Sequence, residues 1–491
     1  MATPLLHSNS AIVMLFFYTL FSLLGFAYGL DLLTPLRRLL SPSSRIDGNA
    51  PRWSEYPAPP SPAPVVHPAT VSDVQITIRW AATHNIPFLV YNGGNGWAAN
   101  LKLDHHNGFF FYLALDLLRS VTFNPDKTVA TIGAGALTAD VVHAGSDAGS
   151  LVATATCDCV GFLGALLGGG ASHLTGQYGL LVDTVLSMDV VLSDGSLRTV
   201  TGSSDPDLWW ALRGAGPNFG VVVEVEVAAH PDAPLTAWQG SLVFSPDKLG
   251  SVLDAVAGLT TSLPPPAALA LLYAAHDGSP AVIVDLFFHG SAFADEAAEC
   301  FASLLTLGPV SGSTSMKQRP WKAWNAPSAF ACRKGGRKPT WGAGLSRFDP
   351  VVFAQVYDVW HDVAQQPGAA NSSMLLNWFP MDKARSLPLT SSAVPFRHEV
   401  GLFPTLTIAY EDAVFDEAAV QYGRRARALW QAADGLGDHH MTVMPERYIN
   451  NAFGDEPLEV VYGYALDRLR RLKKRYDPTC RFSRWFPLLP S

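Results

Sequence analysis

The first regular pattern in the chain is an apolar stripe at helical spacing, followed by a short apolar run. The stripe consists of Val74, Ile78, Ala81 and Ala82. It predicts a helix, and Ser72 with Gln75 forms the expected capping box at its start. Residues 86–91 then predict a buried strand, and the glycines between residues 92 and 96 predict a tight loop after it.

The same alternation of strand, glycine turn and helix continues along the next part of the chain. Residues 129–133 predict a strand and residues 138–144 a helix, with Gly135 in the turn between them. This alternation of strands, glycine turns and helices continues to about residue 227. We therefore expect an α+β lobe in which glycine-rich turns follow the strand ends.

From about residue 229, proline-marked turns replace the glycine-rich ones, so a second lobe is expected. Its predicted strands are residues 242–244, 281–288 and 403–410, and its predicted helices are residues 294–305 and 350–365. A chain of 491 residues is too long for one ordinary core, which agrees with two lobes. Several tryptophans in this lobe suggest an aromatic, apolar pocket. They are Trp238, Trp321, Trp324, Trp341, Trp360 and Trp378.

A basic run at residues 468–475 raises the question of a nucleic-acid partner. Apolar residues flank its charges at helical spacing: Val461, Ala465, Leu469, Leu472 and Tyr476. This spacing predicts an amphipathic helix whose charges face solvent. The net charge of −8 also argues against nucleic acid, so we expect none.

The N-terminus carries an uncharged apolar segment at residues 11–29, which ends in the small-x-small pattern of a signal-peptidase site. We expect residues 1–29 to be a signal peptide, with a retained anchor as the alternative. Either one places the protein in the secretory pathway; we expect secretion and no other membrane association. The sequon at Asn371 agrees with glycosylation on that route.

The most informative motifs are glycine loops in fixed order. They are Cys157-Asp158-Cys159-Val160-Gly161, Gly168-Gly169-Gly170, Tyr178-Gly179-Leu180-Leu181-Val182-Asp183 and Trp209 to Gly220. Glycine is needed where the backbone approaches a ligand closely or takes positive φ. Successive free N–H groups in such loops form nests that hold phosphate.

These motifs resemble the FAD-binding domain of the vanillyl-alcohol-oxidase (PCMH-type) superfamily, and in particular the berberine-bridge-enzyme-like oxidoreductases. Residues 448–482, with Tyr448, Asn450 and Asp477-Pro478, resemble the C-terminal signature of the same family. The resemblance implies an α+β fold: a two-lobed FAD domain split in sequence, with an inserted α/β substrate domain whose antiparallel sheet is covered by helices. The expected parts are an arm at 30–65, FAD-domain pieces at 66–230 and 441–491, and a substrate domain at 231–440.

The family attaches flavin through a histidine in its first glycine loop, and this chain departs from that pattern. The aligned loop is Asn92-Gly93-Gly94-Asn95, so no histidyl link is expected. The family's second anchor is a cysteine, and Cys157 fits its spacing, with a buried thiol or a disulfide partner as the alternatives. The four other cysteines then remain for disulfides, and Cys159 in particular could pair elsewhere.

The resemblance also implies the rest of the FAD cradle and the electron acceptor. A valine at the place of Val160 is associated in the family with oxidases, so dioxygen is the expected acceptor. Two roles stay open for Arg213: a contact to the cofactor, or a structural ion-pair partner. The remaining expected cofactor contacts are Gly161, Gly164, Gly169, Gly170, Tyr178, Gly179, Asp183, Asn218, Gly220 and Val222.

Tyr448 is the leading candidate for a catalytic base, with Asn450 as its orienting partner; the alternative is that both support a turn between the lobes. His398 is a weaker candidate. Thr407 stands where some relatives place a glutamate base. No metal site is expected, because the paired histidines lack further ligands at metal spacing.

The sequence thus favours an FAD-linked oxidoreductase of a small, mainly apolar metabolite, with ring closure of the oxidised product as an added outcome in secondary metabolism. Three alternatives stay open. They are a redox-neutral cyclase that keeps its flavin, a secreted carbohydrate or alcohol oxidase, and a flavoprotein that only binds or stores its ligand. The sequence carries no signal of an oligomeric state.

Overall fold

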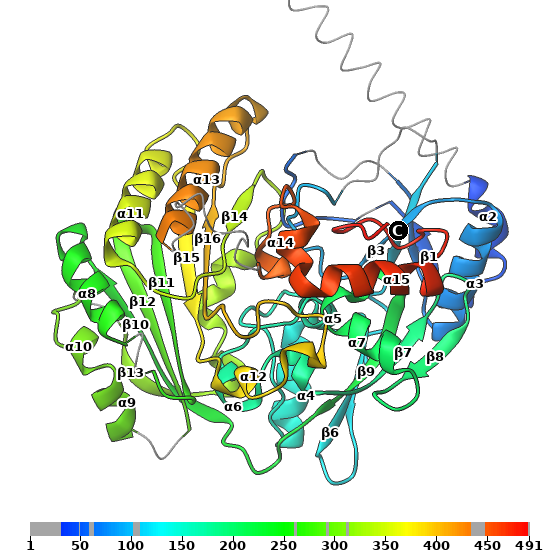
Figure 1. The fold of residues 1–491 in the computed structure, drawn as a ribbon, viewed down its shortest axis with the longest axis horizontal. Helices are drawn as coiled ribbons and strands as arrows, with labels where there is room; N and C mark the ends of the chain where they lie inside the picture. The colour runs from blue at the N-terminus through cyan, green and yellow to red at the C-terminus, as the bar shows by residue number, and fades with distance from the viewer. Residues whose placement is uncertain are drawn as a thin grey trace, which may run out of the picture.

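A computed structural model describes residues 31–489, apart from residues 49, 58–62, 102–108, 260–262, 291–293, 311–313 and 434–446. The N-terminal apolar segment therefore lies outside the described residues. Within the described part, no helix has both the length and the apolar character needed to cross a bilayer. The molecule has two lobes, and the C-terminal segment lies on the lobe that contains the N-terminal sheets (Figure 1).

A four-stranded sheet with the order β1-β2-β4-β3 begins the first lobe. Its strands are β1 (Arg45–Asp47), β2 (Val65–His67), β3 (Phe88–Tyr91) and β4 (Phe111–Ala114), and α2 (Thr34–Arg37) and α3 (Val71–Thr83) accompany them. The predicted capping box of α3 is wrong by two residues. Thr70 has extended backbone and accepts from the Asp73 amide, while Asp73 accepts from the Thr70 amide; Ser72 lies inside the first turn.

A five-stranded antiparallel sheet with the order β5-β6-β9-β7-β8 completes the first lobe. Its strands are β5 (Val121–Phe123), β6 (Val129–Gly133), β7 (Val185–Val191), β8 (Leu197–Val200) and β9 (Val221–Ala228). The helices around it are α4 (Thr138–Ala148), α5 (Phe162–Leu167), α6 (Thr175–Tyr178) and α7 (Pro206–Ala215). The glycine motifs lie in the segments that join α4 to α5, α5 to α6, α6 to β7 and α7 to β9.

The second lobe is a seven-stranded antiparallel sheet with the order β13-β10-β12-β11-β15-β16-β14. Its strands are β10 (Thr236–Phe244), β11 (Ala267–His276), β12 (Ser279–His289), β13 (Thr314–Pro320), β14 (Thr340–Gly342), β15 (Ser373–Trp378) and β16 (Leu402–Thr407). One face packs on helices (Figure 1): α8 (Leu249–Leu259), α9 (Ala294–Cys300), α10 (Ala302–Leu305), α11 (Pro350–Ala364) and α13 (Asp416–Gln431).

Alternation along β12 separates the two faces of this sheet. Val284 and Leu286 are buried in the core that the sheet shares with the helices, whereas Asp285 lies in a cavity on the opposite face and Phe287 packs against the first lobe. The predicted helix at residues 294–305 is two helices that break at Phe301, and the predicted strand at 403–410 ends at Thr407.

The C-terminal segment returns to the first lobe through α14 (Leu458–Tyr462) and α15 (Leu466–Tyr476), and α15 packs beside α7 (Figure 1). The amphipathic prediction for α15 is right for Leu469 and Leu472, which are buried. It is wrong for Lys473, which is fully buried. Its Nζ donates to Asp477 and to the Asn218 carbonyl, both at 2.7 Å, because a buried charge needs such partners.

Candidate active site

A cleft of about 440 Å³ lies between the first lobe, the C-terminal segment and the sheet of the second lobe. Asn377 of β15 and Phe403 of β16 bring the seven-stranded sheet into its wall. The rest of the wall comes from Arg52, Phe379 and residues within 88–101, 112–115, 134, 155–171, 217–222, 448–452 and 481–485. Segments far apart in sequence therefore enclose one space of the size that a large organic ligand needs.

Two glycine loops meet at the base of the cleft. A Cβ on Gly93 would lie 2.7 Å from the Gly161 amide nitrogen, so only glycine allows this contact. The amides of residues 93–96 donate no hydrogen bond to any described residue, although these residues line the cleft. A row of unsatisfied N–H groups at a cleft wall is a nest suited to an anion.

Three arginines add positive charge to this wall: Arg52, Arg481 and Arg484. The Arg52 side chain is 9% exposed, and its Nη2 donates to the Gly96 carbonyl at 2.9 Å. Burial lowers the pKa of the Arg52 guanidinium. The sequence reasoning missed all three arginines. Arg52 precedes the proline-rich segment, and the one available signal was that Arg481 lies within the C-terminal signature and Arg484 just after it.

Other predicted contacts also line the cleft. Asn92 donates to the Ala134 carbonyl at 2.6 Å, and Asn95 donates to the Cys159 carbonyl at 2.8 Å, so both amides brace the loops. A histidine-type bond from Asn95 is chemically excluded. The predicted residues found in the wall are Asn92, Gly93, Gly94, Asn95, Cys157, Val160, Gly161, Gly164, Gly220 and Val222.

Cys157 is a free thiol beside a disulfide. Cys159 and Cys332 form the disulfide, with Cα atoms 5.6 Å apart, and the Cys157 Sγ lies 3.5 Å and 3.6 Å from the two bonded sulfurs. The expectation that Cys159 pairs elsewhere is thus confirmed. Burial raises the pKa of the Cys157 thiol, and the thiol lines the cleft.

Tyr448 and Asn450 form a fixed pair in the cleft wall. The Tyr448 phenol oxygen accepts from Asn450 Nδ2 at 2.9 Å and from the Ala171 amide at 3.2 Å, and Asn450 also donates to the Ala165 carbonyl at 2.8 Å. Burial raises the pKa of the Tyr448 phenol, although both hydrogen bonds oppose the rise. No described residue accepts the phenol proton, so this O–H is available to a ligand.

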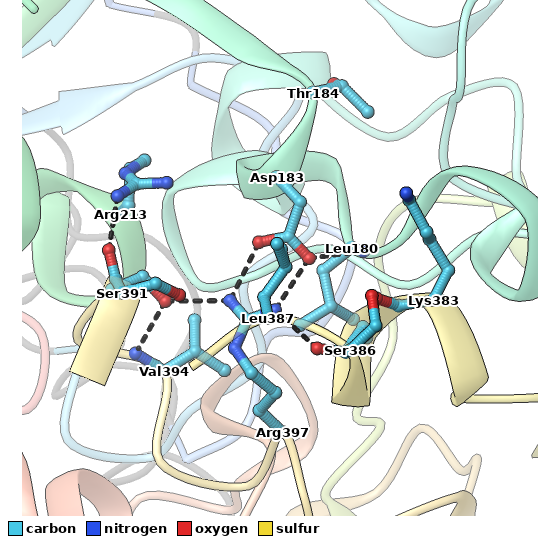
Figure 2. A network of polar contacts seen from close by, with 12 residues as sticks. Leu180, Asp183, Thr184, Arg213, Lys383, Ser386, Leu387, Ser391, Val394 and Arg397 are labelled. Carbon is cyan, nitrogen blue, oxygen red and sulfur yellow. Dashed lines mark hydrogen bonds and ion pairs between the residues drawn. The ribbon is translucent and has the colours of Figure 1, made fainter. Parts of the chain in front are cut away.

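Several predicted cofactor contacts lie outside the cleft wall: Gly169, Gly170, Tyr178, Gly179 and Asp183. Figure 2 shows why Asp183 is not free to contact a cofactor: both of its carboxylate oxygens accept hydrogen bonds from Arg397, each at 2.7 Å. Both side chains are almost fully buried, so each charge is satisfied by the other. Arg213, also in Figure 2, donates to the Ser391 carbonyl and is likewise outside the cleft wall.

The glycines of this group shape the backbone behind the cleft. Gly169, Gly170 and Gly179 all have positive φ, and a Cβ on Gly170 would overlap Leu181. Tyr178 stacks on His230 with ring centroids 4.0 Å apart. These residues therefore position the loop that donates to Tyr448.

Asn218 is buried, but its partners are not a cofactor. Its Nδ2 donates to Tyr462 at 3.0 Å, and its Oδ1 accepts from the Leu488 amide at 3.0 Å. The motif that ends at Gly220 therefore holds the C-terminal segment in place through the hydrogen bonds of Asn218. This segment in turn supplies Tyr448, Arg481 and Arg484 to the cleft.

Two further expectations concern the second lobe. His398 does not line the cleft; its Nε2 lies 3.0 Å from the Leu387 carbonyl, so the proposal of a catalytic role for it is wrong on position. Thr407 bonds Thr340 at 3.1 Å and also lies outside the wall. Phe403 is the residue of β16 that reaches the cleft, and its ring packs 5.3 Å from that of Tyr448.

A second cavity of about 120 Å³, here called the sheet cavity, adjoins the cleft. The two share Thr156, Cys157, Asn377 and Phe379 in their walls. The cleft, with its anion nest and buried arginines, fits a long cofactor with phosphate groups, and the sheet cavity leaves room beside it for a second molecule. Such an arrangement defines a cofactor-dependent enzyme with a separate substrate pocket.

Comparison with known proteins identifies the cofactor. Residues 62–201 match the FAD binding domain family. FAD-linked oxidoreductase hasG of Aspergillus fumigatus is 33% identical over 454 residues, which cover 87% of this chain and 91% of the relative. The chain therefore belongs to the FAD-linked oxidoreductases.

Solved structures agree with this fold. Wild-type BBE-like 1 of Physcomitrella patens superposes with a TM-score of 0.74 at 17% identity, covering 96% of this chain and 99% of that one. Xylooligosaccharide oxidase of Myceliophthora thermophila superposes with a TM-score of 0.71 at 24% identity, covering 87% and 92%. The expected family, fold class and FAD-linked enzyme class are thus confirmed.

Proposed function

We propose that this protein is an FAD-dependent oxidase of a small, mainly apolar organic metabolite, with dioxygen as the electron acceptor. The observation that carries the proposal is Tyr448, whose phenol proton is unengaged by any described residue where the cleft wall meets the seven-stranded sheet. Bound FAD accepts two electrons as a hydride. The residues around it would hold the substrate, and the Tyr448 phenolate, formed when the phenol has lost its own proton to solvent, would receive the substrate's proton.

The wall residues support specific roles. The nest at residues 93–96 and Arg52, Arg481 and Arg484 fit the pyrophosphate of FAD. Val160 is small and lines the cleft, which leaves room for dioxygen. Asn450 holds the Tyr448 phenol in place.

The test is an anaerobic titration of the purified yellow protein with a metabolite panel. We expect one substrate class to bleach the flavin absorbance, and admitted air to restore it with one hydrogen peroxide formed per substrate oxidised. Full FAD occupancy with no bleaching across the panel contradicts the proposal.

A redox-neutral cyclase is the second candidate, because no aspartate or glutamate lies among the described residues of the cleft wall. Product mass separates the two functions: loss of two hydrogens supports oxidation, and an isomer supports cyclisation. A carbohydrate oxidase is less favoured, because Leu272, Phe287, Phe330, Leu375 and Phe379 make the sheet cavity largely apolar. Xylobiose in the panel tests it.

We also propose that Cys157 is the single covalent anchor of FAD, since its thiol lines the cleft and Asn95 replaces the usual histidine. Acid precipitation should then leave the flavin on the polypeptide. Cys157→Ala should release it, whereas Cys300→Ala, which changes a free cysteine on α9, should not. Free FAD in the supernatant of the unmutated protein rejects the bond.

Passage through the secretory pathway, with cleavage near residue 29 and secretion, is a further proposal. The Cys159–Cys332 disulfide and the exposed Asn371 sequon support it, because disulfides persist in oxidising compartments. N-terminal sequencing of protein recovered from the medium tests it, and an intact N-terminus on cell-retained protein contradicts it.

A further inference from the structure

The sheet cavity has a built polar row that neither the fold nor the FAD site requires. Strand register places Ser241 of β10, Asp285 of β12, Ala270 of β11 and Asn377 of β15 side by side, and Phe403 of β16 ends the row. Phe403 packs against Tyr448. Adjacent strands are about 4.8 Å apart, so Asp285 lies about 14 Å from the Phe403 end of the row.

The small side chain of Ala270 leaves space in the middle of this row. Asp285, Ala270 and Asn377 all line the sheet cavity, and Asn377 also lines the cleft. A substrate can therefore place one end at Asp285 and its reacting end beside Tyr448. This span suits a molecule of two fused rings or more.

The cavity wall offers hydrogen-bond acceptors that lack donors. Gln239 is 3% exposed; its Nε2 donates to the Trp324 carbonyl at 2.7 Å, which leaves its Oε1 without a partner among the described residues. Among the described residues, only Ser241 donates a hydrogen bond to the Asp285 carboxylate. Buried acceptors without donors are costly, so the arrangement calls for a ligand that donates.

The charge of the wall points to a cation. No lysine or arginine lines the sheet cavity in the described part of the chain, and the titratable groups there besides Asp285 are His173 and Cys157. Burial lowers the pKa of His173 to about 4, so this ring is neutral near pH 7. Burial raises the pKa of the Asp285 carboxyl, which lacks a cationic partner in this wall.

Aromatic rings complete the surroundings. Phe287, Trp324 and Phe379 line the same cavity, and Phe287 packs edge-on against Trp324 with centroids 5.0 Å apart. Ring faces attract a desolvated ammonium group. An aromatic wall with one carboxyl and one free amide oxygen is the chemistry that recognises a protonated amine.

We propose that the substrate carries a basic amine on an aromatic body, and that Asp285 and Gln239 bind this amine in the sheet cavity while the reacting end faces Tyr448. The proposal rests on the proposed function, because the cleft beside the cavity must hold FAD. It assigns Asp285 to substrate selection and places it away from the reacting atoms.

The test uses the FAD-loaded protein with tryptamine and its neutral isostere tryptophol as probes, with binding followed by flavin absorbance and calorimetry. We expect tryptamine to bind at least about tenfold more tightly than tryptophol, since hydrogen bonds to charged groups are the strong ones. Asp285→Asn should remove this preference. Asp254→Asn, which changes an exposed aspartate on α8, should keep it.

A second variant separates recognition from folding. Ser241→Ala keeps the carboxylate but removes the hydrogen bond that stabilises it, so tryptamine binding should persist and its onset should move to higher pH. Equal affinity for the two probes, or a preference that survives in Asp285→Asn, overturns the proposal. Bleaching by neutral substrates alone overturns this inference and leaves the oxidase intact, whereas a protein that no compound bleaches overturns the oxidase itself.

Discussion

The phenol of Tyr448 is held by two donors, Asn450 Nδ2 and the Ala171 amide, which makes its role testable at a single oxygen atom. Removing that oxygen in Tyr448→Phe should lower kcat about a hundredfold or more with the FAD content unchanged. The base form is the phenolate, and burial raises the pKa of this phenol. The kcat/KM of the unmutated enzyme should therefore keep rising above pH about 10. In Tyr448→Phe this rise should be absent.

A matched control separates chemistry from folding. Tyr273 is also a buried tyrosine, whose hydroxyl donates to the Phe353 carbonyl at 3.1 Å in the core of the second lobe, away from both cavities. Tyr273→Phe should lower the unfolding free energy about as much as Tyr448→Phe does, but its kcat/KM should still rise at alkaline pH. A rise that persists in Tyr448→Phe assigns the proton transfer to another group.

Single residues also show the limit of sequence reasoning. Tyr448, Asn450 and the loop 92–95 line the cleft, which agrees with the roles predicted for them. Asp183 and Asn218 were placed wrongly, because a motif also preserves residues that hold its own backbone. Their polar atoms are consumed by Arg397 and by the C-terminal segment, partners that lie hundreds of residues away in sequence.

At the scale of elements, the Cys159–Cys332 disulfide ties the loop before α5 to the 3₁₀ helix Ala326–Cys332. This helix contributes Pro327, Ser328 and Phe330 to the sheet cavity. Replacing both cysteines by serine should lower the unfolding free energy by about 2–4 kcal/mol. It should also raise KM more than it lowers kcat, because the cavity wall loosens while the FAD cleft keeps its glycine loops.

Denaturation curves and steady-state kinetics measure both effects, and Cys300→Ser is the control because Cys300 is a free thiol on α9. Thiol titration of the unfolded protein adds an independent check. With five cysteines and one disulfide, three thiols should react, or two if Cys157 carries the flavin. An unchanged KM in the double variant shows that the disulfide does not shape the cavity.

The elements predicted from the sequence are those whose apolar residues follow the period of a helix or a strand. α4 and α11 and strands β6 and β12 lie within a few residues of their predicted bounds. The misses have local causes. The cap of α3 is set by the extended backbone at Thr70, and the break at Phe301 comes within an unbroken apolar pattern. The register that aligns Ser241, Asp285 and Asn377 depends on strand order, which no local pattern encodes.

For the whole molecule, the two lobes must keep a fixed separation, because the cleft takes its wall from both. Connections that cross between them include the disulfide, the packing of Phe396 and Phe403 on Tyr448, and the ion pair of Arg397 with Asp183. Of these, the ion pair is the one whose loss leaves a buried charge. Its removal should therefore act on the joint between lobes as well as on the loop that carries it.

Arg397→Met tests this joint, since methionine fills much of the volume but leaves Asp183 unpaired in the interior. Breaking a buried pair by removing one partner costs about 3–5 kcal/mol, so the unfolding free energy should fall by that amount. Arg425→Met removes a partner of Asp362 from an exposed pair at 3.8 Å and should cost about 0–1 kcal/mol. Chemical denaturation, monitored by both flavin and tryptophan fluorescence, measures the unfolding free energy of each variant. If the flavin signal of Arg397→Met changes before its tryptophan signal, the ion pair holds the lobes together. If Arg397→Met costs no more than Arg425→Met, the disulfide and the packing hold the lobes without help from the ion pair.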